Sequence, residues 1–247
     1  MRTELDRLER RIRERFVKAF VTYRLLEDDD HVLIGLSGGK DSLCLTEMLA
    51  KRASIDHPRF RVEVVHVRME NIAYETSTDY LEQFCRQLNV PLHIVTTSFD
   101  PSPISKHSSP KPACFLCSWN RRKQLFNLAQ ELGCNKIALG HHQDDLLCTS
   151  LMNLFYQGRF GTMPALLKMR KMPLSIIRPL CMVEESDIIR YAELRGYEKQ
   201  IKLCPYEKES HREDMTKLFE HIQQMNPEAR HSLWNALVRD DKLVEEY

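Results

Sequence analysis

The chain has 247 residues, of which 43% are hydrophobic and 29% charged, with 36 lysine and arginine residues against 35 aspartate and glutamate residues. This composition excludes a disordered chain, a collagen-like repeat and a disulfide-dense scaffold. A net charge of +1 does not mark a nucleic-acid binder, so any contact with RNA would have to come from local basic patches. No apolar run approaches the roughly 20 residues of a membrane span and the charged N-terminus lacks the core of a secretion signal, so we expect a soluble, cytoplasmic protein that does not enter a membrane.

The first two thirds of the chain alternate between strand and helix patterns. Apolar residues at intervals of three and four predict an amphipathic helix over residues 3–26. Strands are then predicted at 31–36, 60–69, 92–99, 136–140 and 175–180, and helices at 41–52, 76–88, 117–133 and 144–156. Such alternation with near-continuous apolar strands predicts an α/β fold with a parallel sheet covered on both faces.

The pattern becomes purely helical after residue 180. Helices are predicted at 185–195, 210–224 and 227–239, while the proline- and serine-rich residues 100–112 are predicted to form a loop. We therefore expect an N-terminal helix over 1–28, an α/β domain over 29–182 and a small C-terminal helical section over 183–247.

The first predicted strand runs into the string Gly35-Leu-Ser-Gly-Gly-Lys-Asp-Ser42, which a helix follows. Two adjacent glycines let backbone N–H groups converge, and the start of a helix adds donors and the positive end of its dipole. Ser37 and Ser42 supply hydroxyl groups and Lys40 a positive charge, while Asp41 fits beside phosphates if Mg²⁺ bridges them. The spacing is not that of a Walker A loop. A plain turn that caps a helix would explain the two glycines but not the whole string, so we predict a phosphate site.

A second polar motif, residues 139–145 (Leu-Gly-His-His-Gln-Asp-Asp), follows a later strand. Ligands bind at the carboxyl ends of parallel strands, which suits this position. Asp144 and Asp145 also suit the start of a helix, so either could serve only as a cap. We favour Asp145 as the functional carboxylate, and His141 over His142 as the contact to a ligand.

Cys114 and Cys117 form a Cys-x-x-Cys pair, which alone could be a redox pair, half of a zinc site or part of an iron–sulfur site. Cys204, beside a proline in a polar stretch, is the best third candidate. Three thiolates without a fourth would leave one coordination position open, as a catalytic site requires. The remaining cysteines are expected to pack in the core: Cys44, Cys85, Cys134, Cys148 and Cys181.

The string Ser37-Gly-Gly-Lys-Asp-Ser42 resembles the signature of the PP-loop ATPases. Together with the Cys-x-x-Cys pair, residues 139–145 and a late cysteine, it makes the chain similar to the tRNA 2-thiocytidine synthetase branch over about residues 30–210. Residues 114–122, 153–158 and 177–180 also match this branch. The branch commonly has a second Cys-x-x-Cys at the late cysteine, but here Ile201 stands in its first position. The extra zinc-binding pairs of the related thiouridine synthetases are missing, which favours the cytidine branch.

This resemblance implies a Rossmann-like domain that adenylates an anticodon-loop cytosine of tRNA with ATP and then replaces its oxygen by sulfur, releasing pyrophosphate and AMP. It assigns Lys40, Asp41 and Asp145 to catalysis. It places Mg²⁺ on Asp41 and Asp145, and a [4Fe-4S] cluster on Cys114, Cys117 and Cys204. The residues expected to bind ATP are Ser37, Gly38, Gly39, Lys40, Asp41, Ser42, Gly140 and His141. Both sites would have to open onto one cavity, and a cysteine desulfurase-type partner would donate the sulfur; a homodimer is the assembly we consider.

RNA contacts are expected from two basic groups. Arg121, Arg122 and Lys123 lie beside the cysteine pair, where we favour RNA contact over a solvated surface. The second group is Arg159, Lys168, Arg170 and Lys171, and a solvated surface would explain Arg170 and Lys171 equally well. A base in an RNA loop can be splayed out into an enzyme pocket.

The sequence also allows other functions. One is ATP-driven thiouridine or lysidine-type modification with structural zinc cysteines, and another is a nucleotide-binding regulator without turnover. A zinc-bearing RNA-binding module is the least favoured, because it leaves the string of residues 35–42, the predicted phosphate loop, unexplained.

Overall fold

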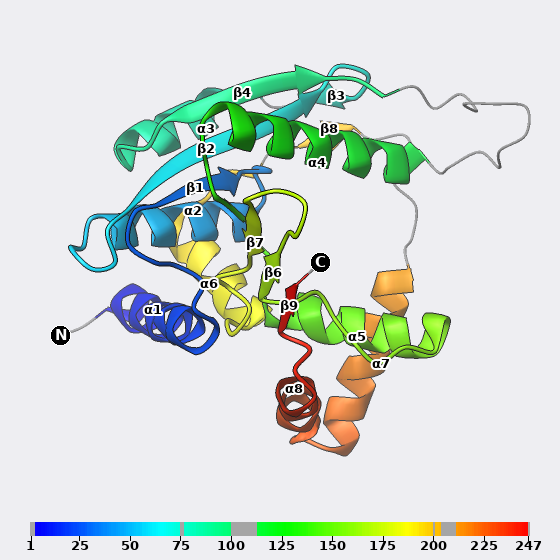
Figure 1. The fold of residues 1–247 in the computed structure, drawn as a ribbon. Helices are drawn as coiled ribbons and strands as arrows, with labels where there is room; N and C mark the ends of the chain where they lie inside the picture. The colour runs from blue at the N-terminus through cyan, green and yellow to red at the C-terminus, as the bar shows by residue number, and fades with distance from the viewer. Residues whose placement is uncertain (1–2, 75–76, 100–112, 200, 204–210, 247) are drawn as a thin grey trace, which may run out of the picture. The chain divides into compact units, whose positions relative to one another are not determined.

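Seven strands form one mostly parallel sheet in the order β4-β2-β1-β5-β7-β6-β9, and two more pair as β3-β8 (Figure 1). The computed structural model describes residues 3–74, 77–99, 113–199, 201–203 and 211–246. The strands are β1 (Asp30–Gly35), β2 (Phe60–Met69), β3 (Ala73–Tyr74), β4 (Leu92–Thr97), β5 (Lys136–Ala138), β6 (Leu166–Lys168), β7 (Ser175–Ile177), β8 (Lys202–Leu203) and β9 (Val244–Glu246). The helices are α1 (Glu4–Tyr23), α2 (Lys40–Ala53), α3 (Asp79–Gln87), α4 (Ala113–Glu131), α5 (Gln143–Gln157), α6 (Glu185–Arg195), α7 (His211–Met225) and α8 (Ala229–Arg239).

The chain divides into two compact units. The first unit comprises residues 28–137 and 197–208, and the second comprises residues 1–27, 138–196 and 209–247. The predicted α/β class with parallel strands is confirmed. The predicted division at residues 28 and 182 stays a prediction. Across the described residues no helix is long and apolar enough to cross a membrane.

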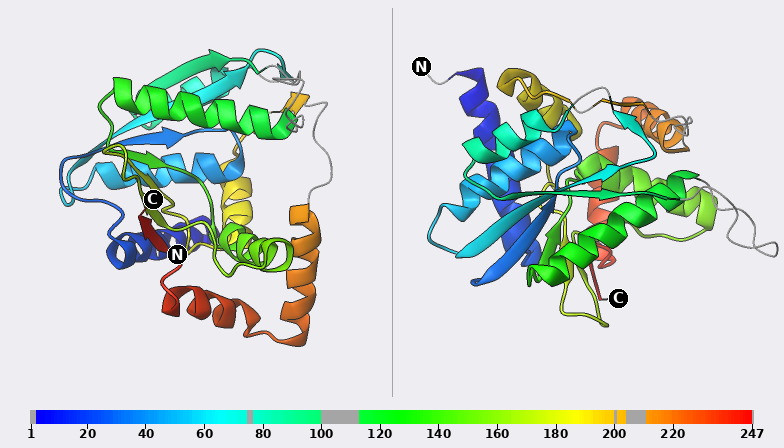
Figure 2. Two further views of the ribbon diagram at one scale, coloured as in Figure 1. Left: turned by 45° about the vertical axis from the view of Figure 1, so that its right-hand side comes forward. Right: turned by 90° about the horizontal axis from the view of Figure 1, so that it is seen from above.

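The first unit is a parallel sheet with helices on both faces. Strand β1 pairs in parallel with β2, and β2 with β4. Val32, Leu33 and Ile34 are fully buried, as expected for a strand that is covered on both sides. Helices α2 and α3 lie on one face of these strands and α4 lies on the other (Figure 2). Because the strands are parallel, their carboxyl ends meet at one edge of the sheet.

A buried polar network fixes β5 beside β1 at the opposite edge. Lys136 Nζ lies 2.7 Å from Asp30 Oδ2, and both side chains are buried. Asn135 donates from Nδ2 to the other oxygen of Asp30 (2.7 Å) and accepts the backbone N–H of His31 (2.8 Å). The buried charges are thus paired and hydrogen-bonded, the arrangement in which burial of a charge is tolerated.

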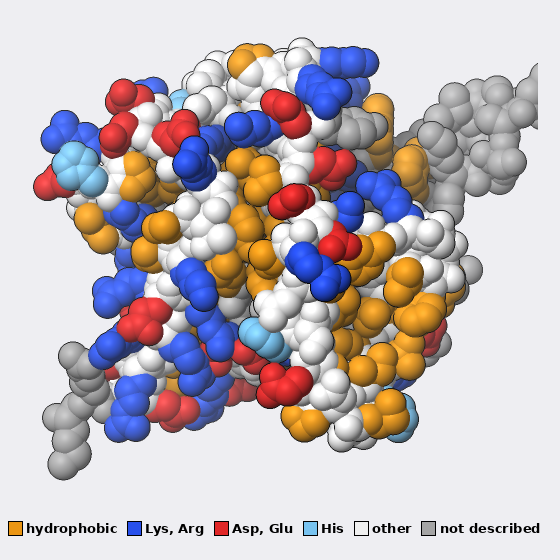
Figure 3. Space-filling model, turned by 60° about the horizontal axis from the view of Figure 1, so that its bottom comes forward, with side chains coloured by type: hydrophobic (Ala, Val, Ile, Leu, Met, Phe, Trp, Pro, Cys, Tyr) orange, Lys and Arg blue, Asp and Glu red, His pale blue; other side chains and the backbone are white. Residues whose placement is uncertain are grey.

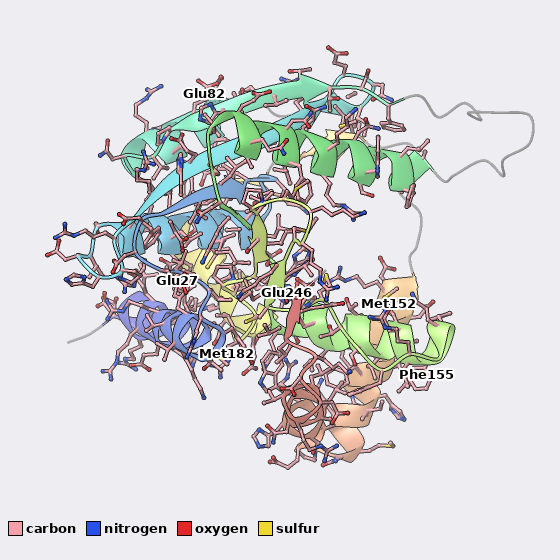
Figure 4. All side chains as sticks on the ribbon, viewed as in Figure 1. Glu27, Glu82, Met152, Phe155, Met182 and Glu246 are labelled. Atoms are coloured by element: carbon pink, nitrogen blue, oxygen red, sulfur yellow. The ribbon has the colours of Figure 1, made fainter. Side chains whose placement is uncertain are left out.

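The second unit is mainly helical. A capping box starts α1, in which the Asp6 N–H donates to Thr3 Oγ1 (3.1 Å) and the Thr3 N–H donates to Asp6 Oδ2 (2.8 Å). The buried stripe of α1 packs against α6, beside an ion pair between Arg11 and Asp187. The outer face of α1 carries basic side chains interleaved with acidic ones (Figure 3), such as Arg10 with Glu14 at 2.7 Å. Helices α7 and α8 pack against α5 and against each other.

The sequence missed four short strands and misplaced the starts of two helices, of which α3 begins at Asp79 rather than at residue 76. Strands β3, β6, β8 and β9 span two or three residues each, too few to show a period of two. The predicted strands 92–99, 136–140 and 175–180 end earlier, at residues 97, 138 and 177. Helix α4 begins at Ala113 rather than at residue 117, so both cysteines of the Cys-x-x-Cys pair lie in its first turns. The predicted loop at 100–112 lies outside the described residues.

Candidate functional site

The phosphate loop folds back onto the first turn of α2 through the hydroxyl group of Ser42. Ser42 Oγ donates to the carbonyl oxygen of Gly39 (2.9 Å) and accepts the backbone N–H of Ser37 (3.2 Å) and the Ser37 hydroxyl (3.1 Å). Gly38 has φ 84°, a left-handed conformation that favours glycine, whereas Gly39, the N-cap of α2, is extended at φ −85°. The loop therefore presents the N-terminus of α2, where backbone N–H groups and the helix dipole attract anions.

Lys40 and Asp41 place opposite charges at this helix start. Lys40 Nζ lies 3.2 Å from Asp41 Oδ1, and both side chains are 31% exposed. The ammonium group can bind a phosphate oxygen, and the carboxylate can accept a hard cation such as Mg²⁺. The six residues Ser37–Ser42 thus lie together at the start of α2, and their predicted binding of ATP and the predicted catalytic roles of Lys40 and Asp41 stay predictions.

His66 also belongs to this site, although the sequence did not point to it. Its Nδ1 lies 2.8 Å from the carbonyl oxygen of Leu36, the residue between β1 and Ser37, and the side chain is buried on β2. Burial lowers the pKa of His66, and the charges of Arg121 and Arg68 lower it further, against an opposing effect of the Leu36 hydrogen bond. The only sequence signal was a histidine within an apolar strand run, Val64-Val-His-Val67.

The cysteine pair lies at the same edge of the sheet as the phosphate loop. Cys117 packs against a buried cluster formed by Met69 at the end of β2, Ile72, Phe99 just after β4, and Leu116 of α4. The start of α4 is thereby fixed at the carboxyl ends of β2 and β4, and the phosphate loop follows the carboxyl end of the parallel strand β1. Cys114 is exposed and Cys117 partly buried, and their spacing of three puts both on one side of the helix.

Cys204 lies outside the described residues, so its predicted place beside the pair stays a prediction. Leu203, the residue before it, pairs with Ala73 in the two-stranded sheet of β3 and β8. Ala73 follows Ile72, a member of the cluster against which Cys117 packs. The late segment of the chain therefore returns to the neighbourhood of the cysteine pair within the first unit.

The basic run after the cysteines is divided between two faces of α4. Arg121 is partly buried and close enough to His66 for its charge to lower the pKa of that imidazole, so it faces β2. Arg122 and Lys123 are exposed. Their adjacency in the sequence predicted one RNA-binding group, and this role stays a prediction for each of the three residues.

The second motif lies at the start of α5 in the second unit. His142 is the N-cap, and its backbone N–H donates to Asp145 Oδ2 (2.9 Å), while Asp145 Oδ1 pairs with Arg212 of α7. Asp144 Oδ2 accepts the backbone N–H of Glu185 (2.8 Å), and its other oxygen pairs with Arg230 of α8.

Both carboxylates are thus caps and ion-pair partners. The sequence missed Arg212 and Arg230, because nothing in their local pattern marks them.

The other predicted residues of the second unit lie at the two ends of α5. Gly140 and His141 precede the helix, and His141 is partly buried. Arg159 follows Gly158, which ends α5 at φ 61°; the Arg159 N–H donates to the Asn153 carbonyl (3.1 Å). Among the described residues no group of three histidine, cysteine, aspartate or glutamate side chains forms a metal site. The predicted roles of these residues stay predictions.

Comparisons with known proteins show which family this chain is similar to. A family described as "PP-loop domain" matches residues 6–200. A tRNA-cytidine(32) 2-sulfurtransferase of Bordetella avium is 34% identical over 242 residues, which covers 96% of this chain and 75% of the relative. One from Acinetobacter baumannii is 33% identical over 234 residues, covering 94% and 76%. The U34-tRNA thiolase NcsA from Methanococcus maripaludis, solved with its [4Fe-4S] cluster, has TM-score 0.74 at 22% identity, covering 94% of this chain and 78% of that chain, a likeness of fold.

Proposed function

Because this chain belongs to the PP-loop family, on the branch of the tRNA-cytidine(32) 2-sulfurtransferases, we propose that it uses ATP to activate a tRNA cytosine and transfers sulfur to carbon C2 of that base. It is an ATP-using transferase, and its resemblance to the thiocytidine branch is confirmed by identity over most of its length. The names of these relatives support tRNA as the substrate and cytidine 32 as its position.

One observation carries the proposal. Within the first unit, the phosphate loop and the start of the cysteine-bearing helix α4 both lie at the carboxyl edge of the parallel strands β1, β2 and β4. Parallel α/β sheets bind their ligands at this edge. A nucleotide on the loop and sulfur at the cysteines would therefore reach one substrate base, as the two-step chemistry demands.

The loop residues account for the first step. Backbone N–H groups at the start of α2 and the charge of Lys40 would hold the β and γ phosphates. The O2 atom of the cytosine would then attack the α phosphate, and pyrophosphate would leave with the electron pair of the broken P–O bond. Oxygen attached to AMP is a far better leaving group than the original carbonyl oxygen, so sulfur can displace it at C2.

Asp41 fits a magnesium ion, because Mg²⁺ typically takes one or two protein carboxylates together with phosphate oxygens. Its carboxylate is partly exposed at the loop, beside Lys40. Asp145 fits less readily, because a backbone N–H and Arg212 already engage its two oxygens. We propose Asp41 as the principal ligand. The predicted role of Asp145 in magnesium binding and those of Gly140 and His141 in nucleotide binding stay predictions.

The thiol residues fit a cluster held by three protein ligands. Cys114 and Cys117 lie one helical turn apart, one exposed and one against an apolar wall, and the residue before Cys204 pairs with β3 beside that wall. When bound, a [4Fe-4S] cluster on three thiolates would supply an iron with an open position for sulfur. The exposed Cys114 also suits delivery of sulfur by a cysteine desulfurase-type partner, which is part of this proposal; the homodimer stays a prediction.

The test is a reaction with anaerobically purified protein, ATP, Mg²⁺, sulfide and unmodified tRNA. We expect one 2-thiocytidine per tRNA, with AMP and pyrophosphate formed in equal amounts. Cys114→Ser should still release pyrophosphate in the presence of tRNA but form no thionucleoside. Cys134→Ser, a buried cysteine of the same unit, is the matched control and should retain thiolation. Formation of 2-thiouridine instead would reassign the base, and ATP cleavage without any thionucleoside would refute thiolation.

A further inference from the structure

The outer face of α4 carries two exposed aromatic rings. Phe115 is 44% exposed and Trp119 is 50% exposed. Their spacing of four residues puts them on one face of the helix, one turn apart. Lys123 continues this face, and its Nζ lies 5.6 Å from the centroid of the Trp119 ring. Large aromatic rings are usually buried, so two adjacent rings that are both partly exposed point to a ligand that covers them.

The charged side chains that α4 places near these rings are basic. The helix contains three basic residues, and its one acidic residue, Glu131, is its last, more than four turns from Phe115. Of the three, Arg122 and Lys123 are exposed on the same side as Trp119. A surface with this charge complements a polyanion.

The rest of the face argues against a protein partner. On the next turns this face continues with Phe126, which is partly buried, Ala129, which is buried, and Gln130, which is exposed, so the exposed apolar surface ends after two side chains. A helix that docks a protein groove usually presents apolar anchors over several turns. Two rings followed by basic and amide side chains instead match the arrangement with which proteins bind single-stranded RNA.

The rings also lie beside the reaction site of the proposed function. Phe115 directly follows Cys114, and the start of α4 is fixed at the carboxyl edge of the sheet. An RNA loop that delivers a base to the cysteines would bring its neighbouring nucleotides close to the first turns of this helix.

We propose that Phe115 and Trp119 form a stacking platform for unpaired loop bases of the tRNA, with Arg122 and Lys123 on the adjacent phosphates. The inference rests on the proposed function and names the part of tRNA that this surface takes, a single-stranded loop. One face of the Trp119 ring lies against the Lys123 ammonium, and the other receives a base. Stacking is tolerant of base identity, so the platform holds the loop without selecting its sequence.

The first experiment measures binding of a labelled RNA hairpin with an unpaired loop by fluorescence anisotropy. Trp119→Ala should raise the dissociation constant by about 5- to 100-fold, and Trp119→Phe, which keeps a ring, by no more than about threefold. Ile55→Ala, which removes a side chain that is 53% exposed at the end of α2, is the matched control and should bind as the wild type does.

Salt dependence separates stacking from charge. Trp119→Ala should leave the slope of log affinity against log salt unchanged. Lys123→Gln should reduce that slope by about 0.7, the share of one phosphate contact.

The second experiment uses Trp119 itself and does not depend on whether the alanine variant folds. The chain has two tryptophans, so Trp234→Phe leaves Trp119 as the only indole. Its emission should be quenched by the hairpin RNA and not by a blunt duplex of the same stem.

Unchanged affinity of Trp119→Ala, or unchanged emission while RNA binds, would overturn the platform. So would loss of self-association in Trp119→Ala with RNA affinity intact, because the face would then be a contact between two copies of the chain. If the wild type thiolates tRNA and Trp119→Ala binds it equally well, only the platform fails. If the wild type neither binds nor thiolates tRNA, the proposed function fails.

Discussion

The Nδ1 atom of His66 lies 2.8 Å from the carbonyl oxygen of Leu36, the last residue before the phosphate loop. A carbonyl oxygen only accepts, so the imidazole donates from Nδ1, and its lowered pKa keeps it in the neutral form that has this single donor. The backbone N–H of Leu36 donates to the carbonyl oxygen of Val65 (2.8 Å), which precedes His66 on β2. Strand β2 therefore holds both polar groups of Leu36 and fixes the direction in which the chain enters the loop.

We expect His66→Asn to preserve the hydrogen bond to the carbonyl oxygen of Leu36 and His66→Gln to lose it. The asparagine amide nitrogen occupies nearly the position of Nδ1, whereas that of glutamine lies farther out. His66→Gln should raise the KM for ATP by about 5- to 20-fold, the loss of one buried hydrogen bond, and His66→Asn by less than about threefold. Steady-state pyrophosphate release with saturating tRNA provides the measurement. Equal defects in both variants would show that His66 only fills space.

The two loop glycines should respond differently to alanine. Gly38 has φ 84°, so Gly38→Ala should lower the free energy of unfolding by about 1–2 kcal/mol. Gly39 is extended, and an added Cβ would meet only Ser37 Oγ at 3.6 Å, so Gly39→Ala should cost less, about 0.5 kcal/mol, because alanine is a poorer N-cap than glycine. Urea unfolding without nucleotide checks this; equal destabilisation would contradict the loop conformation.

The ion pair between Arg230 and Asp144 should stabilise the protein in a pH-dependent way. Burial raises the pKa of Asp144, but hydrogen bonds from Arg230 and from the Glu185 N–H outweigh it and lower the pKa below the ordinary 3.8. A carboxyl group whose folded pKa is lowered stabilises the folded state above its unfolded pKa, and this contribution disappears as the pH falls through the folded pKa.

Arg230→Gln should therefore lower the free energy of unfolding by about 1–2 kcal/mol at pH 7, with the difference from the wild type shrinking below about pH 4. Arg239→Gln is the matched control from the same helix, because Arg239 is 80% exposed beside Asp240 and should contribute little. Denaturant unfolding over a pH series measures both. A difference that grows in acid would refute the assignment.

Alkylation should separate the site cysteines from the buried ones. Alkylating agents react with the thiolate form of cysteine. Burial raises the pKa of Cys85 and Cys181 to about 12 and that of Cys134 to about 11, so these thiols stay protonated. Among the cysteines that the structure describes, iodoacetamide at pH 8 should label Cys114 first in the metal-free native protein, followed by Cys117. Peptide mapping by mass spectrometry identifies the modified residues, and guanidinium should make the buried three reactive. Labelling of Cys85 before Cys114 would contradict the structure.

Several features were readable from the sequence because they are encoded in contiguous residues. The string Ser37–Ser42 after an apolar strand carries its own turn geometry and helix start, so the phosphate loop needed no distant partner to be found. The alternation of apolar strands and helical periods likewise predicted the parallel sheet, since burial on both faces leaves a local mark. Strands β3 and β8 were not predicted, because two residues are too few to show the alternation of a strand.

Only tertiary structure decided which distant side chains contact each of the two motifs. Arg212 and Arg230 reach their carboxylates across 67 and 86 positions of sequence, and His66 reaches Leu36 across 30. Likewise, Arg121 and Arg122 are neighbours in the chain, yet they lie on different faces of α4 because successive residues of a helix point in different directions. The chain's own order determines the turns and periods of its segments, whereas the packing of one segment against another determines which charges meet.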